Sequence, residues 1–210
     1  MLKVLNLYSG IGGNRKLWPQ GIKVTAVEYD SAIASVYADL FPDDELIVAD
    51  AHDYLLSYHQ HFDVIWTSPP CQSHSSFRFN IGVRYRGVKP VYPDMSLYQE
   101  ILLLKTHYKG KWVVENVKPY YKPLLDDYVE IQRHFFWSNC DIKPIVFPKD
   151  NIRSAQIPDL EQVHGYDLSK YKLANKRQVL RNCVYPPLGA YVFNQMLSHS
   201  VYTEDNTPRE

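Results

Sequence analysis

Cys71, which follows two prolines, is the residue of this chain best suited to covalent chemistry. Consecutive prolines cannot continue a sheet ladder or a helix interior, so the backbone must turn away at Pro69 after the apolar segment 62–66. This places the cysteine on a loop at the end of a strand. A thiolate held there is a candidate nucleophile, although many cysteines are only small buried apolar residues.

A second group of residues is suited to binding a nucleotide-like ligand. Gly10 and Gly12 follow the apolar segment 2–8, and Glu28 ends the segment 22–28. Glycines at a strand end allow positive φ angles and a close approach of the backbone to a ligand. An acidic side chain at the end of the next strand accepts hydrogen bonds from ribose hydroxyls. A lone Gly-x-Gly-Gly is also common in ordinary turns, so the glycines alone decide nothing.

The elements that must position these residues alternate between strand and helix. Strands are predicted over residues 2–8, 22–28, 45–49, 62–67 and 111–117. One helix is capped by Asp30 or Ser31, and another covers 96–104. This alternation predicts parallel strands joined by right-handed crossovers. The residues expected to share the carboxyl edge of that sheet are Gly10, Gly12, Glu28, Asp50, Cys71 and Glu115.

Patterns in the second half of the chain are weaker. Strands are predicted over 129–137 and 142–147, and helices over 176–183 and from Pro186 onward. Little regular structure is predicted in 72–93 and 151–171. The polar tail from Thr203 is expected to fray.

Composition is that of an ordinary globular domain with one principal core. Of the 210 residues, 45% are hydrophobic and 22% are charged, and no apolar run is long enough to cross a bilayer. The amino terminus has no signal-peptide layout, so a cytoplasmic location is expected. The three cysteines are widely spaced without a Cys-x-x-Cys pair, which argues against disulfides or a cysteine-bound metal.

Charge is balanced overall but segregated along the chain. Residues 24–77 hold nine acidic residues and no lysine or arginine, whereas 73–93 and 168–203 hold basic residues and no acidic ones. Such a chain can present a basic face to a phosphate backbone while remaining neutral. The ordinary alternative is that these segments are simply solvated surface.

Taken together, the motifs resemble those of the DNA (cytosine-5) methyltransferase family. Residues 7–13 are similar to its first motif, Glu28 and Asp50 to its second and third, 68–72 to its Pro-Pro-Cys-Gln motif, 94–100 to its fifth, 115–117 to its Glu-Asn-Val motif and 181–187 to its last. They occur in family order over residues 4–193. The Pro-Pro-Cys-Gln and Glu-Asn-Val motifs are the specific ones.

The chain departs from the family pattern in three places. Gln132-Arg133-His134 is a poor match to the family's Gln-x-Arg-x-Arg motif. The last motif has Arg181 where glycine is common and Tyr185 inserted before its prolines. Only about 35 residues separate Trp137 from Leu173, where the family has a larger target-recognition region.

The resemblance implies an α/β fold with a doubly wound, mostly parallel sheet of the S-adenosylmethionine-dependent methyltransferase (Rossmann-like) type. The implied division is a catalytic and cofactor-binding domain at 1–138, a small irregular target-recognition segment at 139–172, C-terminal helices at 173–202 and a tail at 203–210. Recognition by so short a segment is expected to be relaxed, or to depend on a partner subunit.

The implied activity is methyl transfer from S-adenosylmethionine to C5 of a flipped-out cytosine in double-stranded DNA. Cys71 adds to C6, Glu115 holds N3 and the exocyclic amine, and loss of the C5 proton then expels the cysteine. The cofactor-binding residues implied are Tyr8, Ser9, Gly10, Gly12, Gly13, Glu28, Tyr29, Asp50, Ala51, Pro69, Leu97, Asn182 and Val184. The DNA-binding residues implied are Gln72, Ser73, Arg78, Arg84, Arg86, Lys89 and Arg133.

Other functions remain open from the sequence. A family branch with the same motifs methylates cytosine in transfer RNA. Enzymes that methylate exocyclic amines resemble the cofactor half but carry an aromatic residue after the two prolines, where this chain has Cys71. A nucleic-acid-binding protein that has lost catalysis is a third possibility, which the intact Cys71 and Glu115 argue against. A modification methylase of a phage or bacterium, with or without a restriction partner, fits the small size.

Overall fold

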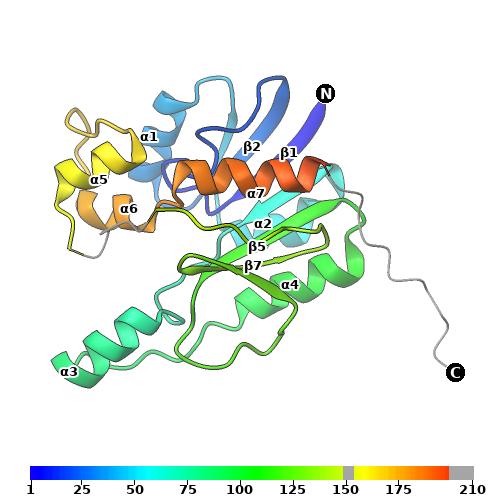
Figure 1. Ribbon diagram of the computed structural model, residues 1–210. Helices are drawn as coiled ribbons and strands as arrows, with labels where there is room; N and C mark the ends of the chain where they lie inside the picture. Colours follow the sequence, from blue (N-terminus) through cyan, green and yellow to red (C-terminus); the bar gives the residue numbers. More distant parts are fainter. Residues whose placement is uncertain (149–153, 199–210) are drawn as a thin grey trace, which may run out of the picture.

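One mixed sheet organises the computed structural model, which describes residues 1–148 and 154–198. Its strand order is β3-β2-β1-β4-β5-β7-β6. The strands are β1 (Leu2–Leu7), β2 (Ile22–Glu28), β3 (Glu45–Val48), β4 (Val64–Thr67), β5 (Lys111–Val117), β6 (Tyr128–Ile131) and β7 (His134–Ser138). Strands β1 to β5 are parallel, and β7 pairs antiparallel with β5 (Figure 1). The predicted α/β class with a mostly parallel sheet is confirmed.

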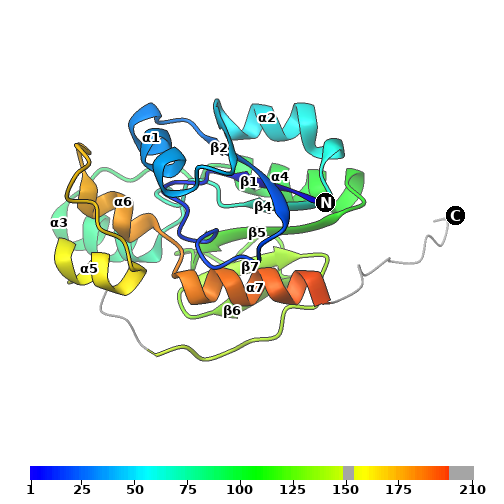
Figure 2. The same ribbon diagram turned by 90° about the horizontal axis from the view of Figure 1, so that it is seen from above.

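Helices cover both faces of this sheet, which explains why its central strands are continuous apolar runs. The helical elements are α1 (Ser31–Leu40), α2 (Ala51–Tyr58), η1 (His59–His61), η2 (Arg78–Val83), α3 (Arg84–Arg86), α4 (Ser96–His107), α5 (Ile157–His164), α6 (Lys176–Asn182) and α7 (Pro186–Ser198). Figure 2 shows α2 and α4 on the opposite side of β4 and β5 from α7. The fold is therefore doubly wound.

Alternate residues of each strand feed the two faces. Ile65 of β4 packs with the apolar side chains of α2 and α4. Trp66 packs instead with Leu188, Val192 and Phe193 of α7. Burial on both sides stabilises the centre of the sheet, and the polar groups that could bind a ligand are left at its edges.

The connection between β1 and β2 is unusual for this kind of fold because residues 8–21 form turns and no helix. Trp18 occupies the space over the sheet, where its ring stacks on Phe193 of α7 with a centroid distance of 4.1 Å. It also contacts Trp66 at 5.8 Å. Helix α7 is thus the principal cover of this face.

Two predicted strands in the second half were wrong. Residues 129–137 form two antiparallel strands, because Gln132 adopts a φ of 55° and reverses the chain. Residues 142–147 form no strand, since Pro144 removes a ladder donor. This segment lies against α7 instead, where Tyr191 donates to the Lys143 carbonyl and Phe147 contacts the Tyr191 ring.

Helices occur where irregular structure was predicted. Residues 78–86 form η2 and α3, and 157–164 form α5. Helix α5 begins with a capping box between Gln156 and Asp159 and ends at Gly165, which has a φ of +65°. These local signals are weak in the sequence because the helix is short. The tail expected to fray from Thr203 lies outside the described residues.

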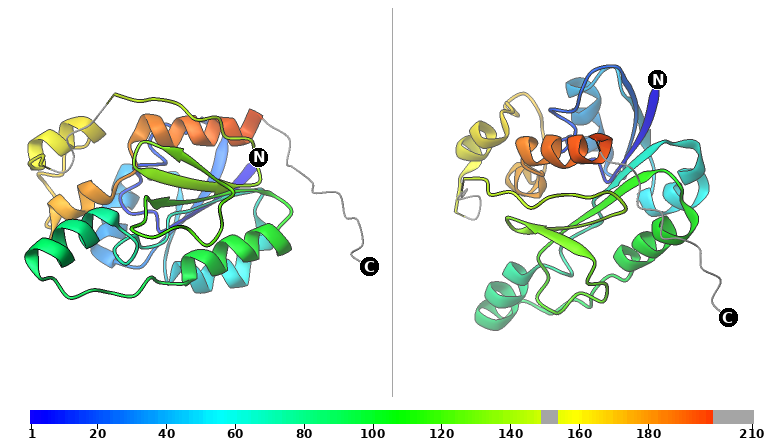
Figure 3. Two further views of the ribbon diagram at one scale, coloured as in Figure 1. Left: turned by 60° about the horizontal axis from the view of Figure 1, so that its bottom comes forward. Right: turned by 45° about the vertical axis from the view of Figure 1, so that its right-hand side comes forward.

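Two helical groups project beyond the carboxyl edge of the sheet. The first is the segment 77–93, here called the arm, which contains η2 and α3; the second is α5 with α6. Figure 1 and both views in Figure 3 show them at the same end of the molecule, with the ends of β1, β4 and β5 between them. Across the described ranges, the helices are all too short or too polar to span a membrane.

Candidate active site

Cys71 lies on a loop that is fixed to β5. Strand β4 ends at Thr67, and the carbonyl of Pro69 accepts a 2.9 Å hydrogen bond from Asn116 Nδ2. The carbonyl of Cys71 accepts from the backbone nitrogens of His74 and Ser75 at 3.1 and 3.0 Å. These bonds hold the loop that carries Cys71 next to the end of β5.

The chain after Cys71 is tied to the segment that follows β5. Ser76 N donates to the Lys118 carbonyl, and Tyr120 N donates to the carbonyl of His74. The His74 ring is 1% exposed, and its Nδ1 lies 2.5 Å from the Tyr121 hydroxyl. The base of the loop is therefore well fixed, whereas the arm projects from it.

Glu115 also lies at the carboxyl edge of the sheet. It is 6% exposed near the end of β5, and its Oε1 lies 2.9 Å from His134 Nδ1 on β7. Burial alone would raise the pKa of Glu115, but His134, a hydrogen bond from Ser68 and the charge of Arg133 together hold the pKa below its ordinary value. The carboxylate is thus stabilised in its charged form.

Arg133 adds positive charge that acts on both Cys71 and Glu115. It occupies the turn between β6 and β7, where its Nη2 donates to the Arg181 carbonyl of α6 at 3.3 Å. Burial and the Glu115 carboxylate raise the pKa of the Cys71 thiol to about 11, and Arg133 opposes this rise. Within this chain alone, the thiol is the favoured form of Cys71 at neutral pH.

The glycine loop after β1 joins the candidate cofactor-binding residues to one another. Gly10 has a φ of +55°, and the position its Cβ would take has no other heavy atom within 4 Å. Its nitrogen donates to Glu28 Oε2 at 3.0 Å. The Ser9 hydroxyl is buried without a hydrogen-bond partner. This loop therefore has an open backbone and an unpaired hydroxyl.

Other predicted cofactor-binding residues surround the same edge. Asp50 caps α2, directly before Ala51, and Tyr29 is 77% exposed beside Glu28. Leu97 is buried in the first turn of α4. Gly12 and Gly13 lie next along the loop from Gly10, and a Cβ on Gly13 would come within 2.6 Å of the Val184 carbonyl. Asn182 ends α6, and its side chain accepts a hydrogen bond from Gln178 at 2.7 Å.

A buried carboxylate that sequence reasoning missed connects four elements behind this loop. Glu100 of α4 is fully buried and accepts hydrogen bonds from Tyr8 at 2.6 Å and from Thr67 at 2.7 Å. His52 Nδ1 of α2 lies 3.1 Å from Oε1, the oxygen that also accepts from Tyr8. In the sequence, this buried carboxylate is indicated by a glutamate that interrupts the apolar stripe Leu97–Leu104. This group is called the Glu100 cluster below.

The predicted DNA-binding residues are brought together only in part. Gln72, Ser73 and Arg78 lie close to the cysteine loop, where Ser73 Oγ accepts from Asp94 N and Arg78 Nη1 reaches the Gln72 carbonyl. Arg84 lies over the Phe79 ring, which stacks on Tyr120 at 4.1 Å. Arg86 and Lys89 are exposed farther out on the arm.

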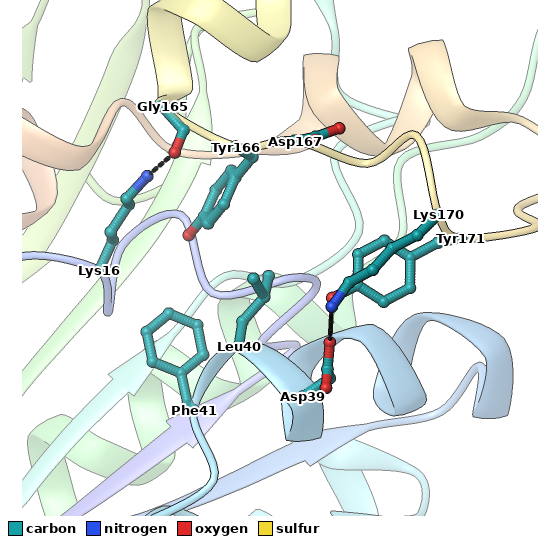
Figure 4. Close-up of a pocket in the computed structure, with 9 residues that line it drawn as sticks. All are labelled: Lys16, Asp39, Leu40, Phe41, Gly165, Tyr166, Asp167, Lys170 and Tyr171. Carbon is teal, nitrogen blue, oxygen red and sulfur yellow. Dashed lines mark hydrogen bonds and ion pairs between the residues drawn. The ribbon is translucent and has the colours of Figure 1, made fainter.

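A cavity of about 670 Å³ lies away from Cys71 and Glu115, between the end of α1 and the segment after α5 (Figure 4). Its cations already have partners. Lys16 binds the carbonyls of His164 and Gly165, and Lys170 pairs with Asp39 at 2.7 Å. It is lined by Lys16, Asp39, Leu40, Phe41, Gly165, Tyr166, Asp167, Lys170 and Tyr171. Because its charges are paired internally, we place the chemistry at the carboxyl edge instead.

No cluster of three or more histidine, cysteine, aspartate or glutamate side chains in ranges 1–148 and 154–198 has the arrangement of a metal site. The described groups at the carboxyl edge are suited to nucleophilic and acid–base chemistry.

Comparison with known proteins identifies a family and a fold. The profile of C-5 cytosine-specific DNA methylases matches residues 2–123, more than half of the chain. Among solved structures, the Entamoeba histolytica methyltransferase EhMeth aligns over 94% of this chain and 98% of that chain, with 12% identity and a TM-score of 0.54. A comparison with curated proteins found no match.

Two further solved structures are similar over about half of this chain. DNMT2 from Spodoptera frugiperda has 24% identity over 56% of this chain and 36% of that chain, with a TM-score of 0.39. A Pyrococcus abyssi tRNA (uracil-54, C5)-methyltransferase in complex with S-adenosyl-L-homocysteine has 18% identity over 57% and 26%, with a TM-score of 0.37. At these identities the structural likeness concerns the fold, which EhMeth shares along nearly the whole chain.

Proposed function

Because the chain belongs to the family of C-5 cytosine-specific DNA methylases, we propose that it transfers a methyl group from S-adenosylmethionine to C5 of cytosine in DNA. Family and fold make it a methyltransferase. The observation that carries the finer assignment is the convergence of Cys71, Glu115 and Arg133 at the ends of β4, β5 and the β6–β7 turn.

Cys71 is the proposed nucleophile because C5 of cytosine is unreactive until the ring is activated. Attack of the thiolate forms the Sγ–C6 bond and breaks the C5=C6 double bond, so that C5 acquires an electron pair able to take the methyl group. Removal of the C5 proton then restores the double bond and expels the thiolate. Since the chain alone favours the thiol, the substrate and nearby cations must favour the thiolate on binding.

Glu115 is the proposed partner of the cytosine ring. Addition at C6 develops negative charge toward N3, which a proton on N3 neutralises. The Cys71 thiol gives up a proton as it attacks, and Glu115, whose carboxylate accepts from the exocyclic amine, is the proposed group that takes this proton and passes it to N3. The loop bond between Asn116 and Pro69 links the strand that carries Glu115 to the loop that carries Cys71. This hydrogen bond helps to fix the position of Cys71 relative to Glu115.

The glycine loop supports the proposed cofactor. When bound, S-adenosylmethionine supplies a methyl group activated on a sulfonium. The open backbone at Gly10 and the unpaired, buried Ser9 hydroxyl fit a polar ligand that approaches the loop closely. Glu28 and Asp50 are oriented by backbone N–H groups, and each oxygen retains acceptor capacity for hydroxyl or amine groups.

Basic side chains on both sides of the carboxyl edge support a nucleic-acid substrate. The arm carries Arg78, Arg84, Arg86 and Lys89, and α6 carries Lys176, Arg177 and Arg181. Figure 1 shows the two groups flanking the ends of the central strands. Cytosine C6 is inaccessible in a stacked duplex, so we propose that the base is flipped out at a cost of a few kcal/mol and that the arm replaces it in the stack.

Covalent trapping tests this function. In DNA that contains 5-fluorocytosine, the methylated adduct has fluorine in place of the C5 proton, so the cysteine cannot be expelled. We expect a protein–DNA adduct that survives denaturing electrophoresis, requires S-adenosylmethionine, and is absent in Cys71→Ala. Glu115→Gln should reduce the rate of trapping by about 100-fold, in the range of positioned acid–base groups.

The matched control is Cys140→Ala, which removes a buried cysteine of the core beneath α7, outside the proposed site, and should still form the adduct. An adduct that persists in Cys71→Ala would overturn the assignment. Turnover should be measured side by side on DNA and transfer RNA, and faster methylation of transfer RNA would reassign the substrate while leaving the chemistry intact.

A further inference from the structure

His134 has no role in the mechanism proposed above, although it lies against the proposed acid. Its side chain is 5% exposed and that of Glu115 is 7% exposed, and Nδ1 lies 2.9 Å from Glu115 Oε1. Nδ1 makes no hydrogen bond of good alignment. The contact is therefore chiefly one of charge, which a protonated imidazole provides and a neutral one does not.

The charges that act on this pair come from the hairpin and from the cysteine loop. Arg133 and Cys71 face it from the β6–β7 turn and the loop after β4, as the effects of Arg133 on the pKa values of both Glu115 and Cys71 show. On the outside of the hairpin, Lys118 pairs with the exposed Glu130 at 2.8 Å. The balance of charge at Glu115 thus depends mainly on Arg133 and His134.

We propose that His134 is a positioning residue of the candidate site, whose protonated imidazole holds Glu115 and balances its negative charge beside Cys71. Without that charge, a Cys71 thiolate and the Glu115 carboxylate repel each other across a buried site. With it, the carboxylate is neutralised locally and the thiolate forms more readily.

The direction of this effect agrees with the balance of forces at Glu115. Burial favours the neutral acid, and His134 is the first among the groups that instead hold the pKa of Glu115 low. Glu115 in turn raises the pKa of Cys71. A charge that compensates Glu115 therefore acts on Cys71 through Glu115, without touching the thiol.

The first test measures the alkylation rate of Cys71 by iodoacetamide from pH 6 to 9, with the modified residue identified by mass spectrometry. At pH 7, His134→Asn should slow this reaction by about tenfold, which corresponds to one pKa unit of the thiol. Asn keeps a polar nitrogen near the position of Nδ1 and removes the charge. His134→Arg, which carries a permanent charge, should recover the rate and hold it at high pH.

A double variant separates electrostatics from packing. In Glu115→Gln, which has no carboxylate to balance, adding His134→Asn should leave the alkylation rate unchanged. A purely structural role would produce the same loss in both backgrounds and would overturn the proposal. Equal rates for wild type and His134→Asn across the pH range would overturn it as well.

An NMR spectrum of the His134 ring at pH 7 provides a readout without any substrate, and it covers the case in which His134→Asn fails to fold. The ring nitrogen shifts of His134 should differ between wild type and Glu115→Gln, and identical shifts would contradict the pairing. The control is His164→Asn. His164 is buried, and its pKa is lowered to about 4 by burial and by Arg133 and Lys16, so its removal should not change the alkylation profile above pH 6.

The inference rests on the proposed function for its meaning in catalysis, but its tests do not. Failure of covalent trapping on DNA, together with His134 ring shifts that respond to Glu115→Gln, would reject the substrate and keep the pairing. Trapping that succeeds while alkylation is insensitive to His134 would keep the function and reject the pairing.

Discussion

A single buried carboxylate, that of Glu100, links the ends of several elements through hydrogen bonds. It accepts hydrogen bonds from Tyr8 after β1 and from Thr67 at the end of β4, and it contacts His52 in α2. Tyr8 has a φ of 53°, an uncommon conformation for a residue other than glycine. The Tyr8 bond thus maintains a strained backbone at the entrance to the glycine loop.

Glu100→Gln should lower the free energy of unfolding by about 2 kcal/mol, because the new amide donors face groups that already donate. Urea denaturation monitored by circular dichroism would measure the change. The matched control is Glu130→Gln, which breaks the exposed pair with Lys118 and should cost less than about 1 kcal/mol. An equal loss in the two variants would show that the Glu100 cluster has no special role.

Removing the His52 partner of Glu100 should change the pH dependence of stability. Hydrogen bonding to Glu100 raises the pKa of His52, so the stabilisation from this contact is complete below the ordinary pKa of histidine. It is lost as the pH rises through the raised value. The stability difference between wild type and His52→Gln should therefore be larger at pH 5.5 than at pH 9, and a larger difference at pH 9 would contradict the pairing.

At the scale of elements, the arm is the most exposed part of the candidate site. The Phe79 ring stacks on Tyr120, and Arg84 lies over the Phe79 ring. The base of the arm is therefore ordered by aromatic contacts. Tyr85 and Tyr92 are 81% and 94% exposed. A basic segment with exposed aromatic rings is suited to contacts with phosphates and with unstacked bases.

Arg86→Gln should weaken DNA binding in a way that depends on salt. Each lost phosphate contact lowers the slope of log K against log salt concentration by about one. Fluorescence anisotropy with labelled duplex DNA between 50 and 200 mM salt would measure this slope. Lys23→Gln is the control, because Lys23 lies at the start of β2, on the edge opposite the site. An unchanged slope in Arg86→Gln would remove this residue from the interface.

The parallel half of the sheet could be predicted because its information is local. Apolar runs, the Asp30 cap and the prolines before Cys71 each mark one boundary, and crossover rules then fix the common edge. The β6–β7 hairpin could not be predicted, since its reversal depends on one residue, Gln132, in a left-handed conformation without a glycine. The same turn brings His134 to Glu115.

The polar clusters escaped prediction for a related reason. Glu100 reads as one polar residue in an apolar stripe, and its partners are 33 to 92 residues away in sequence. In the sequence, His134 is visible only as part of a poor match to the family's Gln-x-Arg-x-Arg motif. The roles of Glu100 and His134 become visible only when strands distant in sequence are neighbours in the fold. Cys71 could be predicted because the two prolines that mark its loop directly precede it in the sequence.

At the scale of the molecule, the segment proposed for target recognition is small. In the described parts of the chain between β7 and α6, residues 139–148 and 154–175, α5 is the one helix, and it packs against α6 and α1 through Leu160 and Leu180. A short helix offers few side chains to read base edges, and each good contact discriminates by about 1–3 kcal/mol.

We therefore expect the isolated protein to methylate cytosines in a short or degenerate sequence context. Bisulfite sequencing of plasmid DNA treated with the purified protein would map the modified positions. Cys71→Ala is the control for background conversion. A long, stringent site read by the chain alone would contradict this expectation.

The position of α7 has a consequence for synthesis on the ribosome. Strands β1, β4 and β5 all emerge before the helix that covers one of their faces, and residues 8–21 provide only Trp18 as an early substitute. Until residues 186–198 leave the exit tunnel, that apolar face is open to water, to chaperones and to other nascent chains. Covering of this face is thus delayed until α7 has been made, and a ribosome that stalls before α7 presents a half-covered, aggregation-prone intermediate.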